Sequence, residues 1–314
     1  MKIKKTLNRR SSFLDDQSFH RKKFDTTVII TSFKEPKTIG RAIEAFQNQR
    51  TKRTFEILVS APDKETLDVA RKYKVKIFKD EGKGKSTALN LLFKKIKSDI
   101  LILTDGDVFV NDNAVEEILK LFENSRVGCV TGRPVPIENK KTKYGYWANF
   151  LFDAVHKIRK KAYQKNEFIE CSGYLFAFRK KEINQIPLDV AEDTIIPYFF
   201  AEKKYKIAYA EKAEVYVKNV DNLKDWIKQK VRTSKAHETI DRYVDTDKIK
   251  RVKSFGNESK GFFSLFAYSK NLKEFYWSLE LAFVRLYMWI VVFWDTKMKN
   301  RNYGDNWERV ESTK

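Results

Sequence analysis

Short β-branched runs alternate with longer amphipathic segments over residues 26–132, and this alternation constrains the fold more than any other feature. The apolar runs are TTVIIT, FEILVS, VKIFK, DILILT and VGCVT, separated by four segments such as TIGRAIEAFQNQ and KSTALNLLFKKI. Five strands separated by four helices are typical of a parallel sheet that helices cover on both faces. Ligands bind such α/β sheets at the carboxyl ends of the strands. We therefore expect the functional site to include TSFKE, after the first strand, and TDGDV, after the fourth.

The pattern changes beyond residue 133. YGYWANFLFDAVHKIRKKAY predicts an aromatic-rich helix, YLFAFR a short strand, and NLKDWIKQKVRTSKAH a further helix, with a second acidic cluster at AEDTIIPYFFAEK. The sequence thus divides into a basic, flexible N-terminal arm over 1–25, an α/β domain over 26–240 and a C-terminal helical segment over 241–314.

The charge of the chain points to a polyanionic partner. Lys and Arg number 63 against 42 for Asp and Glu, a formal net charge of +21. Nucleic acid, phosphorylated small molecules and an anionic membrane face all meet this description. Basic and acidic residues are interspersed, however, which argues against a nucleic-acid-binding arm. The two cysteines show no CxxC spacing, so a reducing cytosol is expected, and no apolar run near the N-terminus resembles a secretory signal.

Asp105 and Asp107 stand one residue apart directly after an apolar strand. If the strand continued they would share one face, where two carboxylates repel. A cation would relieve that repulsion, and magnesium is normally bound by one or two carboxylates together with substrate phosphates. The alternative is a loop in which Asp105 caps the next helix or binds backbone amides.

Three further motifs carry groups suited to phosphate binding or proton transfer. GKGKSTALN is a Gly-rich loop entering a helix whose N-terminal amides favour an anion, or else a basic turn with Ser86 as N-cap; it lacks the P-loop spacing. In AEDT, Glu192 and Asp193 either stabilise a helix N-terminus or supply a general base. In QKVRT, Gln229 and Arg232 share one helical face, and the guanidinium suits phosphate oxygens.

Together and in this order, the motifs resemble the family 2 glycosyltransferases, including the cellulose synthase and hyaluronan synthase branch. The resemblance covers roughly residues 26–235. VIITSFKEP resembles the opening strand and loop, GKSTALN the GKxxALN motif, TDGD the DxD motif, CSGYLFAFR the acceptor-side loop, AEDT the ED pair and QKVRT the QxxRW motif. It implies a GT-A fold, which is Rossmann-like with a mostly parallel central sheet, here followed by C-terminal amphipathic helices.

The resemblance also implies roles for individual residues. Asp193 would be the catalytic base, Asp107 would bind the metal, Mg²⁺ or Mn²⁺, and Ser172, Gly173 and Glu192 would lie on the acceptor side. The residues implied to bind the nucleotide-sugar donor are Thr31, Ser32, Glu35, Asp63, Lys85, Asp105, Asp107, Gln229 and Arg232.

The implied function is a metal-dependent, inverting hexosyl transfer from a UDP- or GDP-sugar to a lipid-linked or saccharide acceptor. Three departures from the family pattern bear on it. Thr233 replaces the Trp of QxxRW, which argues against processive synthesis; VSAPDKET lacks the usual paired aspartates; and the channel-forming membrane spans are missing.

Residues 261–294 hold twelve aromatic residues, but no segment reaches the roughly 20 apolar residues of a bilayer span. A helix lying in an anionic membrane surface, at the cytoplasmic side of the cell membrane, fits the aromatic and basic content. The alternative is that these helices simply pack on the catalytic domain.

Two other functions account for part of the sequence. A nucleotidyltransferase can also place a metal-binding DxD on a similar sheet, but does not predict AEDT followed by QKVRT. A basic nucleic-acid-binding protein would account for the charge and the aromatic residues, yet would leave the ordered acidic motifs without a purpose. No nucleic-acid partner is therefore expected.

Overall fold

The structure is a computed structural model that describes residues 25–245, 248–249, 252, 256 and 262–298. Its strands are β1 (Thr26–Thr31), β2 (Glu56–Ala61), β3 (Lys76–Lys79), β4 (Ile100–Asp105), β5 (Phe109–Val110), β6 (Val127–Pro136), β7 (Leu175–Arg179) and β8 (Lys206–Val217). Its α-helices are α1 (Ile39–Gln47), α2 (Lys64–Arg71), α3 (Lys85–Lys95), α4 (Ala114–Leu121), α5 (Lys143–Gln164), α6 (Glu192–Glu202), α7 (Leu223–Glu238), α9 (Phe262–Ala267) and α10 (Leu272–Phe293). The expected N-terminal arm, apart from residue 25, lies outside the described residues.

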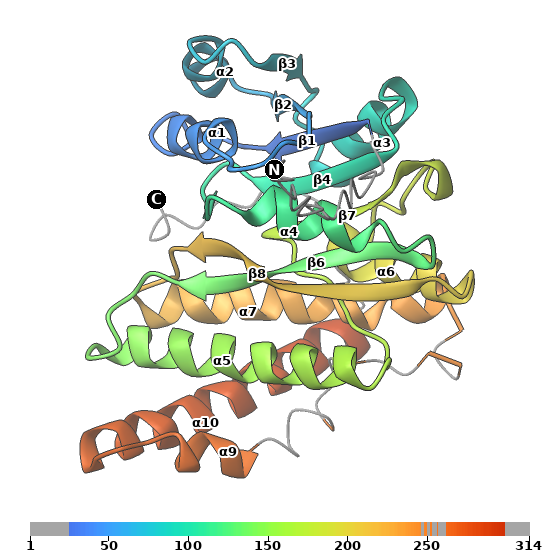
Figure 1. The fold of residues 1–314 in the computed structure, drawn as a ribbon. Coiled ribbons are helices and arrows are strands. Elements are labelled where there is room, and N and C mark those ends of the chain that lie inside the picture. Colours follow the sequence, from blue (N-terminus) through green and yellow to red (C-terminus); the bar gives the residue numbers. More distant parts are fainter. Residues whose placement is uncertain (1–24, 246–247, 250–251, 253–255, 257–261, 299–314) are drawn as a thin grey trace, which may run out of the picture.

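All eight strands join one sheet in the order β3-β2-β1-β4-β7-β6-β8-β5 (Figure 1). The first four of these are parallel, as the alternation of strands and helices predicts. The fifth expected strand, β6, does not lie beside β4, because β7 is inserted between them and runs antiparallel to both. The expected mostly parallel α/β fold is therefore confirmed, with an antiparallel strand at its centre.

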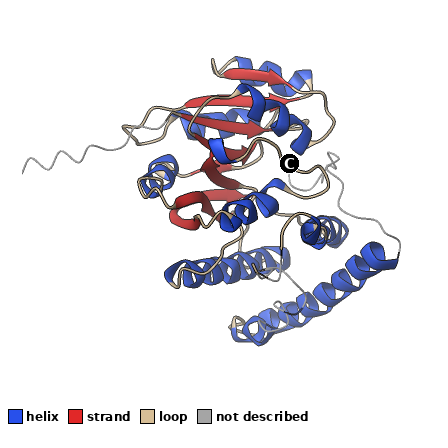
Figure 2. Ribbon diagram, turned by 90° about the vertical axis from the view of Figure 1, so that its right-hand side faces the viewer, coloured by secondary structure: helices blue, strands red, loops and turns tan. Residues whose placement is uncertain are grey.

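Strands β1, β4 and β7 are buried on both faces, which explains their continuous apolar runs. In β1, Val28 and Ile30 face a core formed with α1, α2 and α4, while Ile29 faces a second core formed with α3 and α6. This is the period of two that an extended chain imposes. Helices thus cover both faces of the sheet (Figure 2).

The C-terminal helices pack against α5 and α7, below the sheet in Figure 1. Trp147 of α5, Trp226 of α7 and Leu281 of α10 belong to one buried apolar cluster. Trp147 Nε1 also donates a hydrogen bond to the carbonyl of Trp277, at 2.8 Å. One face of α10 therefore does pack on the catalytic domain. Whether the boundary near residue 240 separates two domains stays a prediction.

The sequence analysis missed β5 and β8. Strand β8 is twelve residues long, and it is paired with β6 in parallel. Its apolar pattern is broken by Glu211, Lys212 and Glu214, which lie where the β6–β8 register shifts. Such an interruption removes the simple alternation by which a strand is recognised.

Candidate functional site

The ends of β1 and β4 meet as expected. Thr31 and Asp105 are register partners in this parallel pair, so both strands end at the same edge. The hydroxyl of Thr31 lies 3.2 Å from the carbonyl of Thr104 and 3.2 Å from Oδ1 of Asp105. The loops TSFKE and TDGDV are consequently neighbours at the carboxyl end of the sheet, where α/β sheets bind ligands.

Gly106, between the two aspartates, explains how the loops fit together. Its N–H donates to the carbonyl of Thr31 at 2.9 Å. A Cβ atom at this position would lie 2.4 Å from Oγ of Ser32 and 2.8 Å from Oε2 of Glu35. Ser32 in turn donates to Oε2 of Glu35 at 2.7 Å. The close approach requires glycine, and it places the predicted donor-binding residues of both loops in one cluster.

Lys85 partly balances the negative charge of the acidic centre, the cluster of Asp105, Asp107, Glu192 and Asp193. It begins α3, and its N-cap Gly84 has φ of 106°, a backbone conformation that favours glycine. Its ammonium group lies 2.6 Å from Asp105 and 2.6 Å from Glu192. Burial acts to lower the pKa of Lys85, but the two carboxylates outweigh it and hold that pKa well above its usual value. Lys85 therefore remains charged and ties β4, α3 and α6 together.

Asp63 has a local structural role. It is the N-cap of α2, where Oδ1 accepts from the amide of Thr66 at 2.9 Å and Oδ2 accepts from the amide of Lys34 at 2.8 Å. Asp80, after β3, is buried close enough that the charge of Asp63 helps to raise its pKa, although burial is the larger cause. Asp63 and Asp80, which follow β2 and β3, therefore lie within electrostatic range of one another.

Asp193 lies at the start of α6, facing the loop that precedes β7. The N–H of Gly173 donates to Oδ2 of Asp193 at 2.8 Å, and a Cβ at Gly173 would come within 3.1 Å of the same oxygen. Burial and then the neighbouring charge of Glu192 raise the pKa of Asp193 to about 6. A carboxylate with a pKa near neutrality is a better proton acceptor than an ordinary one and is still ionised at pH 7.

Groups behind Asp193 hold this loop in place. Arg159 of α5 donates to the carbonyls of Glu170 and Cys171, at 3.2 and 3.0 Å. His237 of α7 has Nδ1 3.6 Å from Oε1 of Glu170, and a charge on His237 acts to lower the pKa of Asp193. The amide of Ser172 donates to Thr131, so Ser172 also contributes backbone structure to the loop.

Tyr174 marks the centre of the site. Burial is the largest cause that raises the pKa of this tyrosine, and the negative charges of Asp107 and Asp105 raise it further. The positive charge of Arg232 acts to lower it. The negative charge of Asp193 also raises the pKa of Tyr174. The side chains after β4, at the start of α6 and on α7 therefore all lie within electrostatic range of one phenol.

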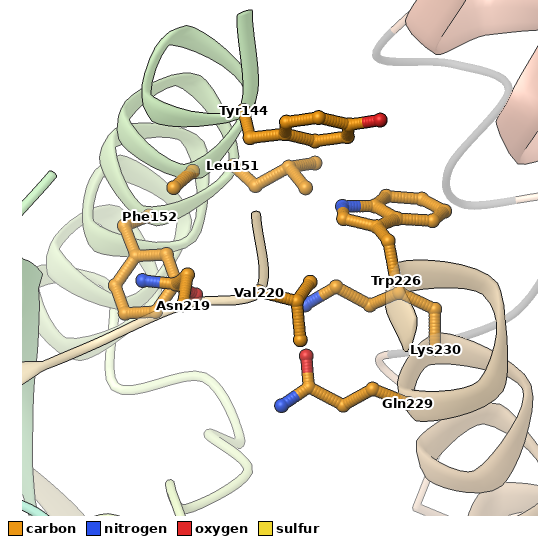
Figure 3. Close-up of a pocket in the computed structure, with 9 residues that line it drawn as sticks. Tyr144, Leu151, Phe152, Asn219, Val220, Trp226, Gln229 and Lys230 are labelled. Atoms are coloured by element: carbon orange, nitrogen blue, oxygen red, sulfur yellow. The ribbon is translucent and has the colours of Figure 1, made fainter. Parts of the chain in front are cut away.

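Gln229, one turn before Arg232, lines a small pocket between α5 and α7 (Figure 3). Its aromatic walls are Tyr144, Phe152 and Trp226. Phe152 also stacks on Tyr174, with ring centroids 6.3 Å apart. The pocket is thus adjacent to the acidic centre and is separated from it by an aromatic pair.

The donor set at the strand end fits a divalent metal that is shared with a diphosphate. Within the described part of the chain, no group of three or more His, Cys, Asp or Glu side chains is placed to hold a metal ion. Asp105 contacts Lys85 and Thr31, and Asp107 is the second carboxylate of the pair. Magnesium and manganese commonly take one or two carboxylates and fill the remaining positions with phosphate oxygens and water.

Most of the predicted site residues converge. The cluster contains Thr31, Ser32, Glu35, Lys85, Asp105, Asp107, Gly173, Glu192, Asp193 and Arg232, with Gln229 at its margin and Ser172 and Asp63 supporting loops. Sequence reasoning missed Asp80, Arg159, Tyr174 and His237. Tyr174 belongs to the CSGYLFAFR motif, so the sequence offered a signal for it. Arg159 is one of several basic residues in the predicted helix, and nothing in the sequence distinguishes it from the others. The catalytic and binding roles stay predictions.

Comparison with known proteins finds relatives among the glycosyltransferases. Among curated proteins, the chain is 28% identical over 184 residues to the O-antigen chain rhamnosyltransferase WbaN of Salmonella anatum. It is 26% identical over 194 residues to a poly-beta-1,6-N-acetyl-D-glucosamine synthase of Staphylococcus aureus (strain COL). These matches cover 54% and 57% of this chain but only 58% and 47% of the relatives, so the chain spans about half the length of the relatives it matches.

The fold is that of the GT-A glycosyltransferases. The solved structure of the mannosyltransferase PcManGT from Pyrobaculum calidifontis, in complex with GDP-Man and Mn²⁺, superimposes with a TM-score of 0.62 at 15% identity. That match covers 90% of this chain and 89% of the other. A family model described as glycosyl transferase family 2 matches residues 27–186, about half of the 314 residues. The chain belongs to glycosyl transferase family 2.

Proposed function

We propose that this protein transfers one sugar from a nucleotide-sugar donor to a saccharide or lipid-linked acceptor, by a metal-dependent single displacement with inversion. The observation that carries the proposal is the convergence of Asp107, Arg232 and Asp193 around Tyr174, with Lys85 paired to the neighbouring Asp105. These groups would provide a metal ligand, two cations and a base from four separate parts of the chain. Asp193 as a base on the acceptor side suits direct attack by the acceptor.

In the proposed reaction, an acceptor hydroxyl oxygen attacks the anomeric carbon, and the bond from that carbon to the phosphate oxygen breaks. Asp193 takes the hydroxyl proton as the new bond forms, which its raised pKa of about 6 favours. Lys85 and Arg232 stabilise the negative charge that develops on the nucleoside diphosphate. A metal bound at Asp107 would supply further charge stabilisation.

The donor would be a UDP- or GDP-sugar, since solved structures with the same fold include one bound to GDP-Man. The names of the curated relatives support a saccharide product, as in O-antigen or poly-N-acetylglucosamine synthesis. Non-processive transfer is supported by Thr233, whose hydroxyl bonds back to the carbonyl of Gln229 at 2.7 Å. A small, exposed side chain at this position offers no ring for a bound polymer to stack on.

A cytosolic location fits the two cysteines. Cys129 and Cys171 are free thiols, although their sulfur atoms are only 3.3 Å apart. A reducing compartment keeps such a pair in the thiol form.

The proposal is tested by screening nucleotide sugars for hydrolysis in the presence of Mn²⁺ or Mg²⁺, because transfer to water can report the donor before the acceptor is known. We expect one donor to be turned over, with inversion at the anomeric carbon detected by NMR, and EDTA to abolish the reaction. Asp107→Ala should abolish metal-dependent binding of the nucleoside diphosphate, measured by calorimetry.

The matched control is Asp112→Ala. Asp112 follows β5, and its exposed carboxylate is paired with Arg50. This variant should bind the diphosphate as the wild type does. Diphosphate affinity that is insensitive to EDTA, and equal in Asp107→Ala, would contradict the metal assignment. Retention of anomeric configuration would contradict the single displacement.

A further inference from the structure

Helix α10 exposes an apolar stripe. Apart from the seven-residue step from Tyr276 to Phe283, the exposed apolar side chains recur at intervals of four residues or fewer along the helix and into the turn that follows it, so they lie on one side of it. They are Tyr276, Phe283, Leu286, Tyr287, Ile290, Phe293 and Trp294, each between 48% and 66% exposed. Glu280, four residues after Tyr276, falls on the same side of the helix, and its side chain is 40% exposed. Figure 1 shows α10 as the outermost layer on this side of the molecule, beyond α5.

Three charged side chains of this helix and of the turn after it contact α5 and α7. Glu280 accepts from Lys143 of α5 at 2.7 Å. Arg285 lies over the ring of Trp226 in α7, 6.0 Å from its centroid. Just past the helix, Asp295 accepts from Lys235 of α7 at 2.6 Å. Both sides of α10 are thus largely apolar: Leu281, Met288 and Val292 are buried against the domain, while the stripe is exposed. An ordinary solvated surface helix carries polar residues on its outer side.

These contacts distinguish a helix that lies on a membrane from one that crosses it. By length and composition Leu272–Thr296 is sufficient to cross a membrane, and only 22% of its most apolar window is buried. An apolar helix long enough to span a bilayer is not expected from the sequence alone. However, Glu280, within this segment, and Asp295, near its end, bind lysines of α5 and α7, and those helices are rich in lysine. A crossing α10 would have to leave these partners or carry them into hydrocarbon, where each charge is costly.

We propose that the outward stripe of α10, defined by the seven residues above, docks flat on an anionic lipid bilayer. Tyrosine and tryptophan favour the headgroup region, and the aliphatic and phenylalanine side chains favour the acyl boundary. The net charge of +21 suits anionic headgroups. Lys270 and Lys273 are exposed at the start of the helix, where they can contact such headgroups. A second copy of the chain is a poorer partner, because two chains that each carry a net charge of +21 repel one another.

Docking in this orientation brings the site close to the lipid surface. Helix α7 lies between them: Ser234 and Lys235 contact α10, while Gln229 and Arg232 belong to the site. Two helices, α10 and α7, therefore separate the bilayer from the acidic centre. This last step rests on the proposed function and favours an acceptor carried on a lipid, whereas the docking itself does not depend on catalysis.

The test is flotation of the full-length protein with vesicles of phosphatidylcholine, with or without phosphatidylglycerol. We expect binding that strengthens with phosphatidylglycerol and falls at least ten-fold in the triple variant Phe283→Gln, Tyr287→Gln, Ile290→Gln. The matched control is Ile137→Gln with Leu188→Gln, which changes two similarly exposed apolar residues away from α10 and should leave binding unchanged. Alkaline carbonate should release the bound protein.

Three results would overturn the proposal. Wild-type protein that does not float with anionic vesicles has no such docking surface. Protein that resists carbonate extraction is inserted across the bilayer. A dimer in sedimentation that the triple variant converts to a monomer shows that a second copy covers the stripe. Donor hydrolysis should be equal in all these variants in solution, so failure of docking is distinguishable from failure of the proposed function.

Discussion

The ammonium group of Lys85 lies 2.6 Å from Oδ1 of Asp105. The lysine begins a helix and the aspartate ends a strand, and the same ammonium reaches Glu192 on a second helix. The repulsion between the two aspartates of TDGD is therefore eased by a side chain of the protein itself. A metal at Asp107 would bind beside a site whose charge is already partly balanced.

Replacing Lys85 should destabilise the fold. In Lys85→Met, Asp105 and the buried Glu192 would lose their shared cation, and removing one partner of a buried ion pair costs about 3 kcal/mol. Since the folded pKa of Lys85 is raised, its stabilising contribution is complete below the ordinary lysine pKa and is lost only as pH rises through the raised value. Urea unfolding at pH 7 measures the loss. Lys83→Met, at an exposed ion pair with Glu81, should unfold as the wild type does; equal midpoints for both variants would refute the structural role.

Asp193→Asn should lower the rate of sugar transfer by about two to four orders of magnitude, the range expected for loss of a general base. Asparagine keeps the shape and can still accept from the Gly173 amide, so donor affinity should change little. Steady-state kinetics and calorimetry with the nucleoside diphosphate separate the two effects. Glu211→Gln, at a surface ion pair with Lys160, is the control. Turnover within a few-fold of wild type would assign the base to another group.

The rate should depend on pH through Asp193. Its pKa of about 6 means that kcat/KM should rise about ten-fold per pH unit below that value and level off above it, because only the ionised form accepts a proton. Glu192→Gln removes one cause of the raised pKa, so the profile should move to lower pH. A profile identical in wild type and Glu192→Gln would argue against the assignment.

The same raised pKa has a consequence for stability with a defined sign. Between the ordinary aspartate pKa of 3.8 and the folded value of about 6, the folded state binds more protons at Asp193 than the unfolded state does. Its contribution therefore becomes less favourable as pH rises through this window. Asp193→Asn should remove that part of the pH dependence in urea unfolding.

Gly106→Ala should impair donor binding. The added Cβ would lie 2.4 Å from Oγ of Ser32, so the TDGD loop or the loop after β1 must shift. A displacement of about 1 Å in a positioned site costs roughly 100-fold in activity. Gly256→Ala is the control, since a Cβ there meets nothing within 4 Å. Normal donor affinity in Gly106→Ala would show that the two loops adjust without cost.

The sequence predicted best where the local pattern and the tertiary role agree. Strands β1 to β4 are apolar runs of ordinary length, and the motifs directly after them fall at the carboxyl edge because the strands are parallel. Strand β8 was not predicted, because its charged residues break the alternation of apolar and polar residues. The position of β7 between β4 and β6 also escaped prediction, because pairing between distant strands leaves no periodic signal in either.

Electrostatic partners that lie far apart in the sequence also could not be predicted. The repulsion within TDGD was recognised from Asp105 and Asp107, but the cation that faces Asp105 is Lys85, which a single sequence does not connect to Glu192. Asp63 is predicted to bind the donor, and in the structure both its carboxylate oxygens accept backbone amides. A capping role of this kind is visible only once the two loops are placed side by side.

The insertion of β7 also determines when the sheet can be completed during synthesis. Thr104, in β4, bonds to a residue 70 positions later in the chain, at the start of β7. Until that segment leaves the ribosome, β4 is an open edge with its backbone groups unpaired, next to three finished strands. Such an edge is a template for intermolecular strand pairing, and non-local closure is slow. The nascent chain is thus most prone to aggregate between the completion of β4 and the arrival of β7, well before the residues that complete the site are made.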